Sequence, residues 1–268
     1  MEPENETQRP IPLWLVAVVL VAFLVFGAPV QALNAGVGIW LCQGLVFVGL
    51  PFFVLRRVGR EPAPLLGLSE FTWPSALFGL AIGALVFFAW AVPLMTIAQH
   101  VFPPELVKLL DGSAIFRNRT EVELTLIVSG VVIAAPLGEE FFFRGVLQRA
   151  LLERLDGPRA VVVTALIFSA FHFDPVGLAA RFAIGLGVGL LAWRTGSIWP
   201  GVFAHAANNG ISTLAYFLSS GAEEADLPWP AVAALWLGGN VLLLGAISLA
   251  RRFPVLVRPA SALRDARH

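Results

Sequence analysis

The sequence predicts an all-α protein that crosses a membrane several times. Of its 268 residues, 57% are hydrophobic and only 13% are charged, and the mean hydropathy is +0.80. Soluble domains carry about 25% charged residues. Long apolar segments recur along the chain, and a backbone in hydrocarbon must satisfy its own hydrogen bonds, as a helix does. The roughly ten-residue alternation that is typical of an outer-membrane barrel is not seen, so the spans are predicted to be helices.

Roughly eight segments can be read as membrane-crossing helices, each of which needs about 20 apolar residues. The chain shows no internal repeat and no separate soluble region, so residues 1–268 are predicted to form a single membrane domain. The first apolar segment follows three glutamates and one arginine, unlike the basic start of a secretory signal peptide, and is expected to be retained. The predicted spans are residues 11–33, 36–55, 75–98, 122–137, 159–171, 178–193, 198–218 and 229–250.

Cationic residues gather at one end of the predicted spans, and short cytoplasmic loops are enriched in Lys and Arg. The connection 219–228 on the other side has three carboxylates and no cation, whereas 101–121 holds three cations and runs against the rule. Both termini are therefore predicted to be cytoplasmic. The arginines on the predicted cytoplasmic side are Arg56, Arg57, Arg60, Arg149, Arg154, Arg159, Arg194, Arg251, Arg252, Arg258, Arg264 and Arg267.

The charge balance argues against nucleic acid as a partner. The chain has 18 Lys and Arg against 18 Asp and Glu, so it offers no basic surface of the kind that binds a phosphate backbone. The predicted surroundings are instead the lipid bilayer. The single cysteine, Cys42, has no partner for an intrachain disulfide and no Cys or His nearby at the spacing of a metal site.

Charged residues within apolar segments are costly, and they therefore mark candidate functional sites. Glu139, Glu140 and Arg144 come directly after the apolar run 122–137. Glu140 and Arg144 are four residues apart, so on a helix they face each other and are predicted to pair. Taken alone, such a pair is usually structural. Glu139 is turned about a third of a revolution away and is left for chemistry.

Two further apolar segments carry histidines. His172 lies at the end of an aromatic-rich segment, and His205 lies four residues before Asn209, which puts that pair on one helix face. Alone, His172 would be a packing residue and the His205–Asn209 pair would join helices by hydrogen bonds. Together with Glu139 they supply a carboxylate to take a proton from water, an imidazole to hold that water, and donors for an oxyanion. This combination favours peptide hydrolysis.

These motifs resemble the CPBP family of intramembrane proteases, which includes CAAX prenyl endopeptidases and bacteriocin-processing (Abi) enzymes. Its pattern is Glu-Glu-x-x-x-Arg, then Phe-x-x-x-His, then His-x-x-x-Asn or Asp, and residues 122–214 contain all three in order. The resemblance implies that Glu139 and His172 activate water, and that His205 and Asn209 stabilise the oxyanion. It also implies that Glu140 and Arg144 support the site.

The resemblance to the glutamate-type CAAX enzyme favours chemistry without a cofactor. A zinc site formed by Glu139, His172 and His205 stays open as an alternative, because two imidazoles and a carboxylate are suitable zinc ligands. The implied substrate is a membrane-embedded or lipid-anchored peptide or protein. Prenylated C-termini, bacteriocin-type peptides and C-terminal sorting tails, as cut by myxosortases, are the substrate classes that the resemblance suggests.

The abundance of Ala, Val, Leu and Arg, with a single Lys, suggests a high-GC bacterium, so the bacterial inner membrane is the expected location. The alternative function is that of a non-catalytic membrane protein, either an immunity factor or a scaffold. The intact set of Glu139, His172, His205 and Asn209 favours an enzyme, because binding alone does not need a water-activating pair.

Overall fold

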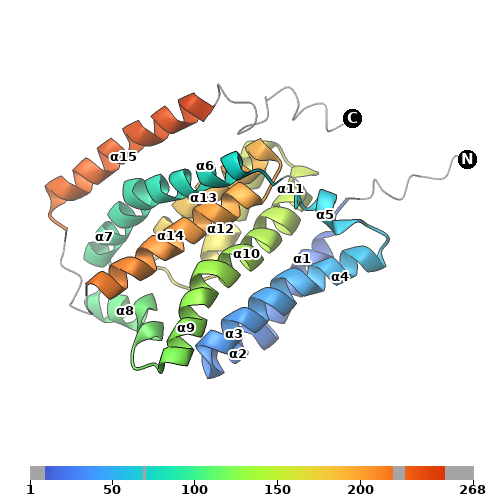
Figure 1. Cartoon of the computed structure of the whole chain (residues 1–268), viewed down its shortest axis with the longest axis horizontal. Helices are drawn as coiled ribbons and strands as arrows, with labels where there is room; N and C mark the ends of the chain where they lie inside the picture. The colour runs from blue at the N-terminus through green and yellow to red at the C-terminus, as the bar shows by residue number, and fades with distance from the viewer. Residues whose placement is uncertain (1–9, 69–70, 220–226, 251–268) are drawn as a thin grey trace, which may run out of the picture.

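The computed structural model describes residues 10–68, 71–219 and 227–250, and this part of the chain is built from helices without a strand (Figure 1). Six helices in it are long and apolar enough to cross a membrane. The predicted all-α, polytopic class is thereby confirmed, and the chain is an integral membrane protein. The six helices are Leu13–Leu33, Ala35–Arg57, Trp73–Val101, Glu121–Leu152, Leu178–Thr195 and Trp229–Leu249.

The predicted count of about eight spans is not confirmed. The other two predicted spans form α12 (Gly157–Ala170) and α14 (Trp199–Leu218). Helix α12 is apolar but has only 14 residues, which is short for a bilayer crossing. Helix α14 has 20 residues, but His205 and two asparagines lower its hydropathy.

The first four long helices are each interrupted by wider, π-helical stretches. The helical parts are α1 (Leu13–Ala22), α2 (Ala28–Leu33), α3 (Ala35–Leu41), α4 (Leu50–Arg57), α6 (Trp73–Val86), α7 (Val92–Val101), α9 (Glu121–Ser129), α10 (Ala135–Glu139) and α11 (Arg149–Leu152). Helices α2, α4, α7 and α10 each follow a π-helical stretch and carry a proline in their first two positions. Proline has no N–H and its ring clashes with the carbonyl of residue i−4, so the preceding turn widens.

The π-helical stretch Glu140–Gln148 is different, because no proline follows it. It continues the helix past residue 137, where the predicted span 122–137 ends, and that boundary is wrong. The charged residues after 137 do not end the helix, because they are buried against neighbouring helices. The Glu-Glu-x-x-x-Arg motif therefore lies inside one continuous helix, Glu121–Leu152. Such stretches are frequent at functional sites.

Small residues let α6 and α14 pack backbone to backbone. A Cβ atom on Gly79 would overlap the backbone of Pro200, and one on Gly83 would overlap that of Ala204. Close approach of this kind is how helices associate in lipid, where apolar burial provides no net drive. Helix α13 (Leu178–Thr195) packs against both helices of this pair, and α12 packs on α13 (Figure 1). Together these helices fix the position of α14, which carries two of the predicted site residues.

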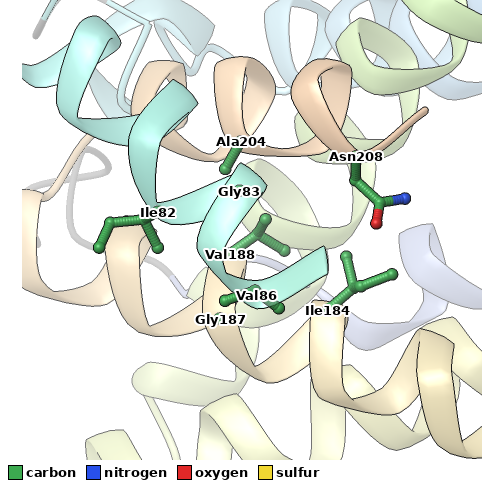
Figure 2. Close-up of a pocket in the computed structure, with 8 residues that line it drawn as sticks. All are labelled: Ile82, Gly83, Val86, Ile184, Gly187, Val188, Ala204 and Asn208. Carbon is green, nitrogen blue, oxygen red and sulfur yellow. The ribbon is translucent and has the colours of Figure 1, made fainter. Parts of the chain in front are cut away.

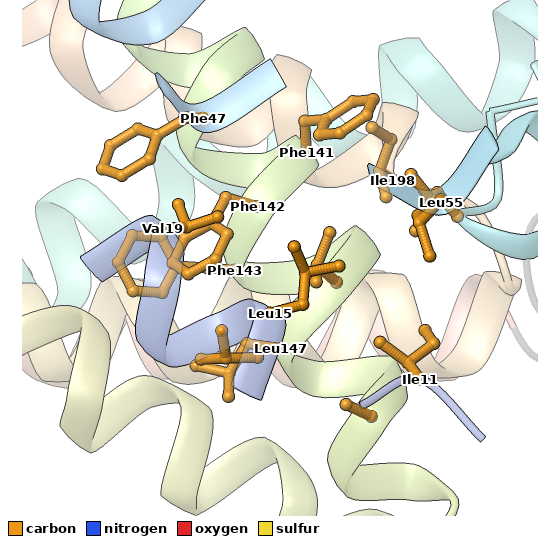
Figure 3. Close-up of a cluster of buried hydrophobic side chains, with 14 of the residues drawn as sticks. Ile11, Leu15, Val19, Phe47, Leu55, Phe141, Phe142, Phe143, Leu147 and Ile198 are labelled. Atoms are coloured by element: carbon orange, nitrogen blue, oxygen red, sulfur yellow. The ribbon is translucent and has the colours of Figure 1, made fainter. Parts of the chain in front are cut away.

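Aromatic side chains pack the helix Glu121–Leu152, called the motif helix below, against the N-terminal helices (Figure 3). Phe141, Phe142 and Phe143 are all buried, although successive residues on a helix point in different directions. Phe142 stacks on Phe47 of the second long helix at 5.3 Å, and Phe143 meets Phe168 of α12 edge-on at 5.2 Å. The motif helix is therefore enclosed on several sides, at the level of its charged residues.

Short helices connect the long ones, namely α5 (Pro62–Leu65) and α8 (Pro104–Leu109), and α15 (Trp229–Ala250) packs on the outside of the bundle (Figure 1). Several residues used in the predicted orientation lie outside the described residues. They are Arg251, Arg252, Arg258, Arg264, Arg267 and the three carboxylates of 219–228. Both chain termini also lie outside the described residues. The cytoplasmic placement of the termini accordingly stays a prediction.

Candidate active site

The predicted site residues come from three regions of the bundle. Glu139 ends α10, and Glu140 and Arg144 lie in the π-helical stretch that follows. His172 lies in the turn after α12, and His205 and Asn209 lie on α14. The structure brings the two glutamates, Arg144 and both histidines into one cluster.

Glu139 lies at the centre of the cluster. Its Oε2 is 4.0 Å from Nε2 of His172 and 3.9 Å from Nε2 of His205. This buried oxygen accepts no hydrogen bond from any described residue. Both distances exceed the length of a direct hydrogen bond, about 2.7–3.2 Å, and suit a bridged contact. Three polar atoms therefore converge on one small region.

The ring of His172 has a defined orientation. Its Nδ1 lies 2.8 Å from the carbonyl oxygen of Phe168, which only accepts hydrogen bonds, so Nδ1 carries the proton. In the neutral ring the lone pair is then on Nε2, which faces Glu139. A water molecule between Oε2 and Nε2 would donate one proton to each. The pair is thus arranged to polarise a water molecule.

The turn after His172 is held by Asp174. This carboxylate accepts hydrogen bonds from two backbone N–H groups of the turn, at 2.9 and 3.1 Å, and from the guanidinium of Arg181. Phe173, which lies between His172 and Asp174, has a φ of 52°, a backbone conformation that residues other than glycine rarely adopt. The anchored turn fixes the place of His172 at the end of α12. Sequence reasoning missed this supporting pair, although Arg181 lies within the predicted span 178–193 and Asp174 lies just before it.

His205 is held from its other side by Glu140. Nδ1 of His205 is 2.9 Å from Oε1 of Glu140, and Nη1 of Arg144 is 2.8 Å from the same oxygen. Glu140 and Arg144 are both fully buried, so the ion pair is shielded from water. The predicted i,i+4 contact is present, and Glu140 has a second role that the sequence did not indicate. It orients one of the two histidines.

Arg144 and Gln148 join the motif helix to α13. Arg144 Nη2 donates to the carbonyl of Gly185 at 3.1 Å, and Gln148 Nε2 donates to that of Gly189 at 3.0 Å. Donors and acceptors are both four residues apart, so the two bonds repeat along the contact. The Arg144 guanidinium also lies 4.7 Å from the centre of the Phe168 ring, a favourable cation–π distance.

Asn209 is placed differently from the other predicted residues. Its Nδ2 donates to the carbonyl of Val131 at 2.9 Å, and its Oδ1 accepts from Asn208 at 3.1 Å. The bond to Val131 attaches α14 to the motif helix, whereas Asn208 lies on α14 itself. A hydrogen bond from Asn209 to Glu139 or to either histidine is not among the contacts of the described residues.

Gln43 is a site residue that the sequence reasoning missed. Its Nε2 donates to Oε1 of Glu139 at 3.4 Å, although the two residues are 96 positions apart in the sequence. Glutamine carries no charge, so a search for ionisable residues in apolar segments passes over it. A search for any buried amide in such a segment would have found it.

Access to the cluster is uneven. The side chain of His172 is 31% exposed and that of Glu139 is 14% exposed, whereas that of His205 is 6% exposed. A cavity between α6, α13 and α14 measures only about 10 Å³, which is room for a single water molecule at most (Figure 2). The side of the cluster next to His172 is therefore the open one.

The polar atoms of this cluster lie farther apart than the ligand atoms of a tetrahedral zinc site. Zinc bonds of about 2.0–2.2 Å place tetrahedral ligand atoms roughly 3.3–3.5 Å apart. The corresponding separations here are 3.9 and 4.0 Å. Within the described part of the chain, no group of three or more His, Cys, Asp or Glu side chains is arranged to hold a metal ion.

Two comparisons with known proteins found a match. Residues 121–211 match the model of the Type II CAAX prenyl endopeptidase Rce1-like family. A stretch of 88 residues, 33% of this chain, is 35% identical to a Bacillus subtilis (strain 168) protein named "Putative membrane peptidase YdiL". The alignment covers 35% of that relative's length. No solved structure matches significantly.

The matched segment contains every predicted site residue from Glu139 to Asn209, while Gln43 lies outside it. The residues of the three motifs are the ones that fall within the family match. Residues 121–211 of this integral membrane protein therefore carry the motifs of the CAAX protease (CPBP) family and match its Rce1-like model.

Proposed function

We propose that the chain is an intramembrane endopeptidase that hydrolyses a peptide bond in a membrane-embedded or lipid-anchored substrate. One observation carries the proposal. The unpartnered Oε2 of Glu139 faces Nε2 atoms of two histidines whose other ring nitrogens are each held by a fixed acceptor. An unpaired oxygen alone does not distinguish Glu139, because Oε2 of the buried Glu140 also lacks a hydrogen bond from the described residues. Glu139 differs in that its unpaired oxygen faces two imidazole nitrogens.

In the proposed reaction, Glu139 acts as general base and His172 helps to hold the water. The water oxygen attacks the scissile carbonyl carbon while one water proton passes to Glu139. The C–N bond then breaks while this proton passes from Glu139 to the leaving nitrogen, so the products are a carboxylic acid and an amine. General bases of this kind contribute about 10²–10⁴-fold to the rate.

His205 and Asn209 are the proposed donors to the oxyanion. Nδ1 of His205 already bonds to Glu140, so Nε2 donates only when the ring carries both protons. The ring lies between two carboxylates, with Nε2 3.9 Å from Glu139 and Nδ1 2.9 Å from Glu140. The amide nitrogen of Asn209 that bonds to Val131 has a second N–H group. This group would donate a hydrogen bond to the oxyanion once substrate is bound.

The proposed chemistry uses no metal, and this is directly testable. We expect detergent-purified chain to contain much less than one zinc per molecule by elemental analysis. Its peptidase activity should survive exhaustive chelation, because Glu139 activates the water itself. Stoichiometric zinc, with activity lost on chelation and restored by adding zinc, would contradict this and would make Glu139, His172 and His205 metal ligands.

The substrate is proposed to be a hydrophobic peptide segment in the bacterial inner membrane, with both chain termini of the enzyme in the cytoplasm. Membrane proteomics on the native cell should reveal it. Cells that express Glu139→Gln in place of the wild-type chain should accumulate proteins that keep an extra terminal segment. The cleaved bond is then read from the wild-type fragment.

The nature of the retained segment distinguishes the substrate classes. A lipid-modified C-terminus, a short secreted peptide and a hydrophobic sorting tail give different masses and locations. If no protein changes length between the two strains, while deletion of the gene still has a phenotype, a non-catalytic immunity or scaffold role becomes the better account.

A further inference from the structure

Gln43 occupies an unusual position for an amide. It lies in the long apolar helix Ala35–Arg57 and is only 5% exposed. Burial of an amide in an apolar medium is unfavourable unless the amide is hydrogen-bonded. The bond from its Nε2 to Oε1 of Glu139 is the contact that compensates for this burial.

The neighbouring backbone is shaped to admit Gln43. A Cβ atom on Gly138 would lie 2.8 Å from Cβ and 3.0 Å from Cα of Gln43, closer than such atoms approach. Only glycine at position 138 therefore lets the second long helix come this near to the motif helix. The close contact stands directly beside Glu139 and fixes the amide relative to that carboxylate.

The two oxygens of Glu139 have different surroundings. Oε1 accepts from Gln43, and Oε2 points toward the histidines without a hydrogen bond from the described residues. Since a carboxylate only accepts, the amide nitrogen of Gln43 has to be the atom that faces it. The amide oxygen of Gln43 accepts no hydrogen bond from any described residue. The amide is thus anchored only at Glu139.

We propose that Gln43 is a positioning residue, which holds Oε1 of Glu139 so that Oε2 faces the water between the histidines. The inference rests on the proposed function. It adds to the site a residue from outside the family-matched segment 121–211. The N-terminal helices would then complete the site, and residues 121–211 alone would hold their general base loosely.

The first test compares two buried glutamines. Gln43→Met keeps the length of the side chain and removes the donor. Gln148→Met is the matched control, because Gln148 is 1% exposed, donates one hydrogen bond to a backbone carbonyl and leaves its own oxygen unpartnered. We expect kcat to fall about 10- to 100-fold in Gln43→Met, with KM little changed, because misplacing a catalytic group costs this much. The control should keep the wild-type kcat.

The second test uses Gln43→Glu, whose side chain has the same shape. A carboxyl group donates a hydrogen bond to Glu139 only while it is protonated, and it repels Glu139 when ionised. The activity of Gln43→Glu relative to wild type should therefore rise as the assay pH is lowered. Neither wild type nor Gln148→Met should show this recovery. A residue with a merely structural role would not change the shape of the pH profile.

Both assays use the full chain in liposomes and a synthetic peptide that spans the cleavage point found by proteomics. A wild-type kcat in Gln43→Met, or a Gln43→Glu profile of wild-type shape, overturns the assignment. If Glu139→Gln is inactive in the same assay, only the role of Gln43 has failed. If Glu139→Gln is as active as wild type, the proposed function has failed as well.

Discussion

Replacing Glu139 with Gln is expected to lower peptidase activity by about 10²–10⁴-fold, the usual contribution of a general base. Glutamine has the same shape as glutamate and still accepts a hydrogen bond from Gln43, but it cannot take a proton from water. The fold should be preserved, since Glu139 is partly exposed and Oε2 has no partner to lose. The measurement is the initial rate of peptide cleavage by purified chain.

Glu121→Gln provides the control for this change. Glu121 begins the same long helix, is exposed, and loses the same charge on substitution. This variant should cleave at the wild-type rate and express to the same level. Equal rates in Glu139→Gln and wild type would remove Glu139 from the chemistry. A loss of activity in Glu121→Gln as well would mean that the effect is one of helix charge rather than of catalysis.

The sequence predicted the helical class and most of the cluster because both depend on local spacing. Glu140 and Arg144 contact each other because residues four apart share a helix face, and this holds in the π-helical stretch that the structure shows. Apolar runs are similarly local, so the long helices could be recognised. The convergence of three distant motifs was inferred from their chemistry and from a family resemblance, which local spacing alone does not provide.

The contacts that could not be predicted are those between distant segments. Gln43 and Glu139 meet because Gly138 lets two helices approach, which depends on packing rather than on either local sequence. Similarly, the contact of Asn209 with Val131 depends on how α14 crosses the motif helix. Spacing placed Asn209 on the face of His205, but it gave no partner for the amide.

The predicted end of the motif span was wrong for a different reason. Hydropathy falls at Glu139, so the sequence suggested that the span ends at residue 137. In the structure Arg144 is compensated by Glu140 and by the carbonyl of Gly185, and Glu140 also contacts His205. The helix therefore continues to Leu152. The predicted number of spans was affected in the same way, since the polar residues of the site also reduce the hydropathy of α14.

Glu140→Ala is expected to be the most destabilising single change at the site. It leaves the buried Arg144 guanidinium without its carboxylate, and breaking a buried ion pair in this way costs about 3–5 kcal/mol. It also removes the acceptor for Nδ1 of His205. Thermal unfolding in detergent should show a clear loss of stability, and peptide cleavage should fall as well. A Glu140→Ala chain as stable as wild type would contradict the structural role of the pair.

A double variant separates stability from activity. Glu140→Ala combined with Arg144→Met removes both charges, and replacing a buried ion pair by apolar groups is often close to neutral. We therefore expect the double variant to unfold at a higher temperature than Glu140→Ala alone. Its activity should not recover, because His205 still lacks the acceptor that orients its ring toward Glu139. Recovery of both properties together would show that Glu140 serves only to neutralise Arg144, and that the orientation of His205 is set by other contacts.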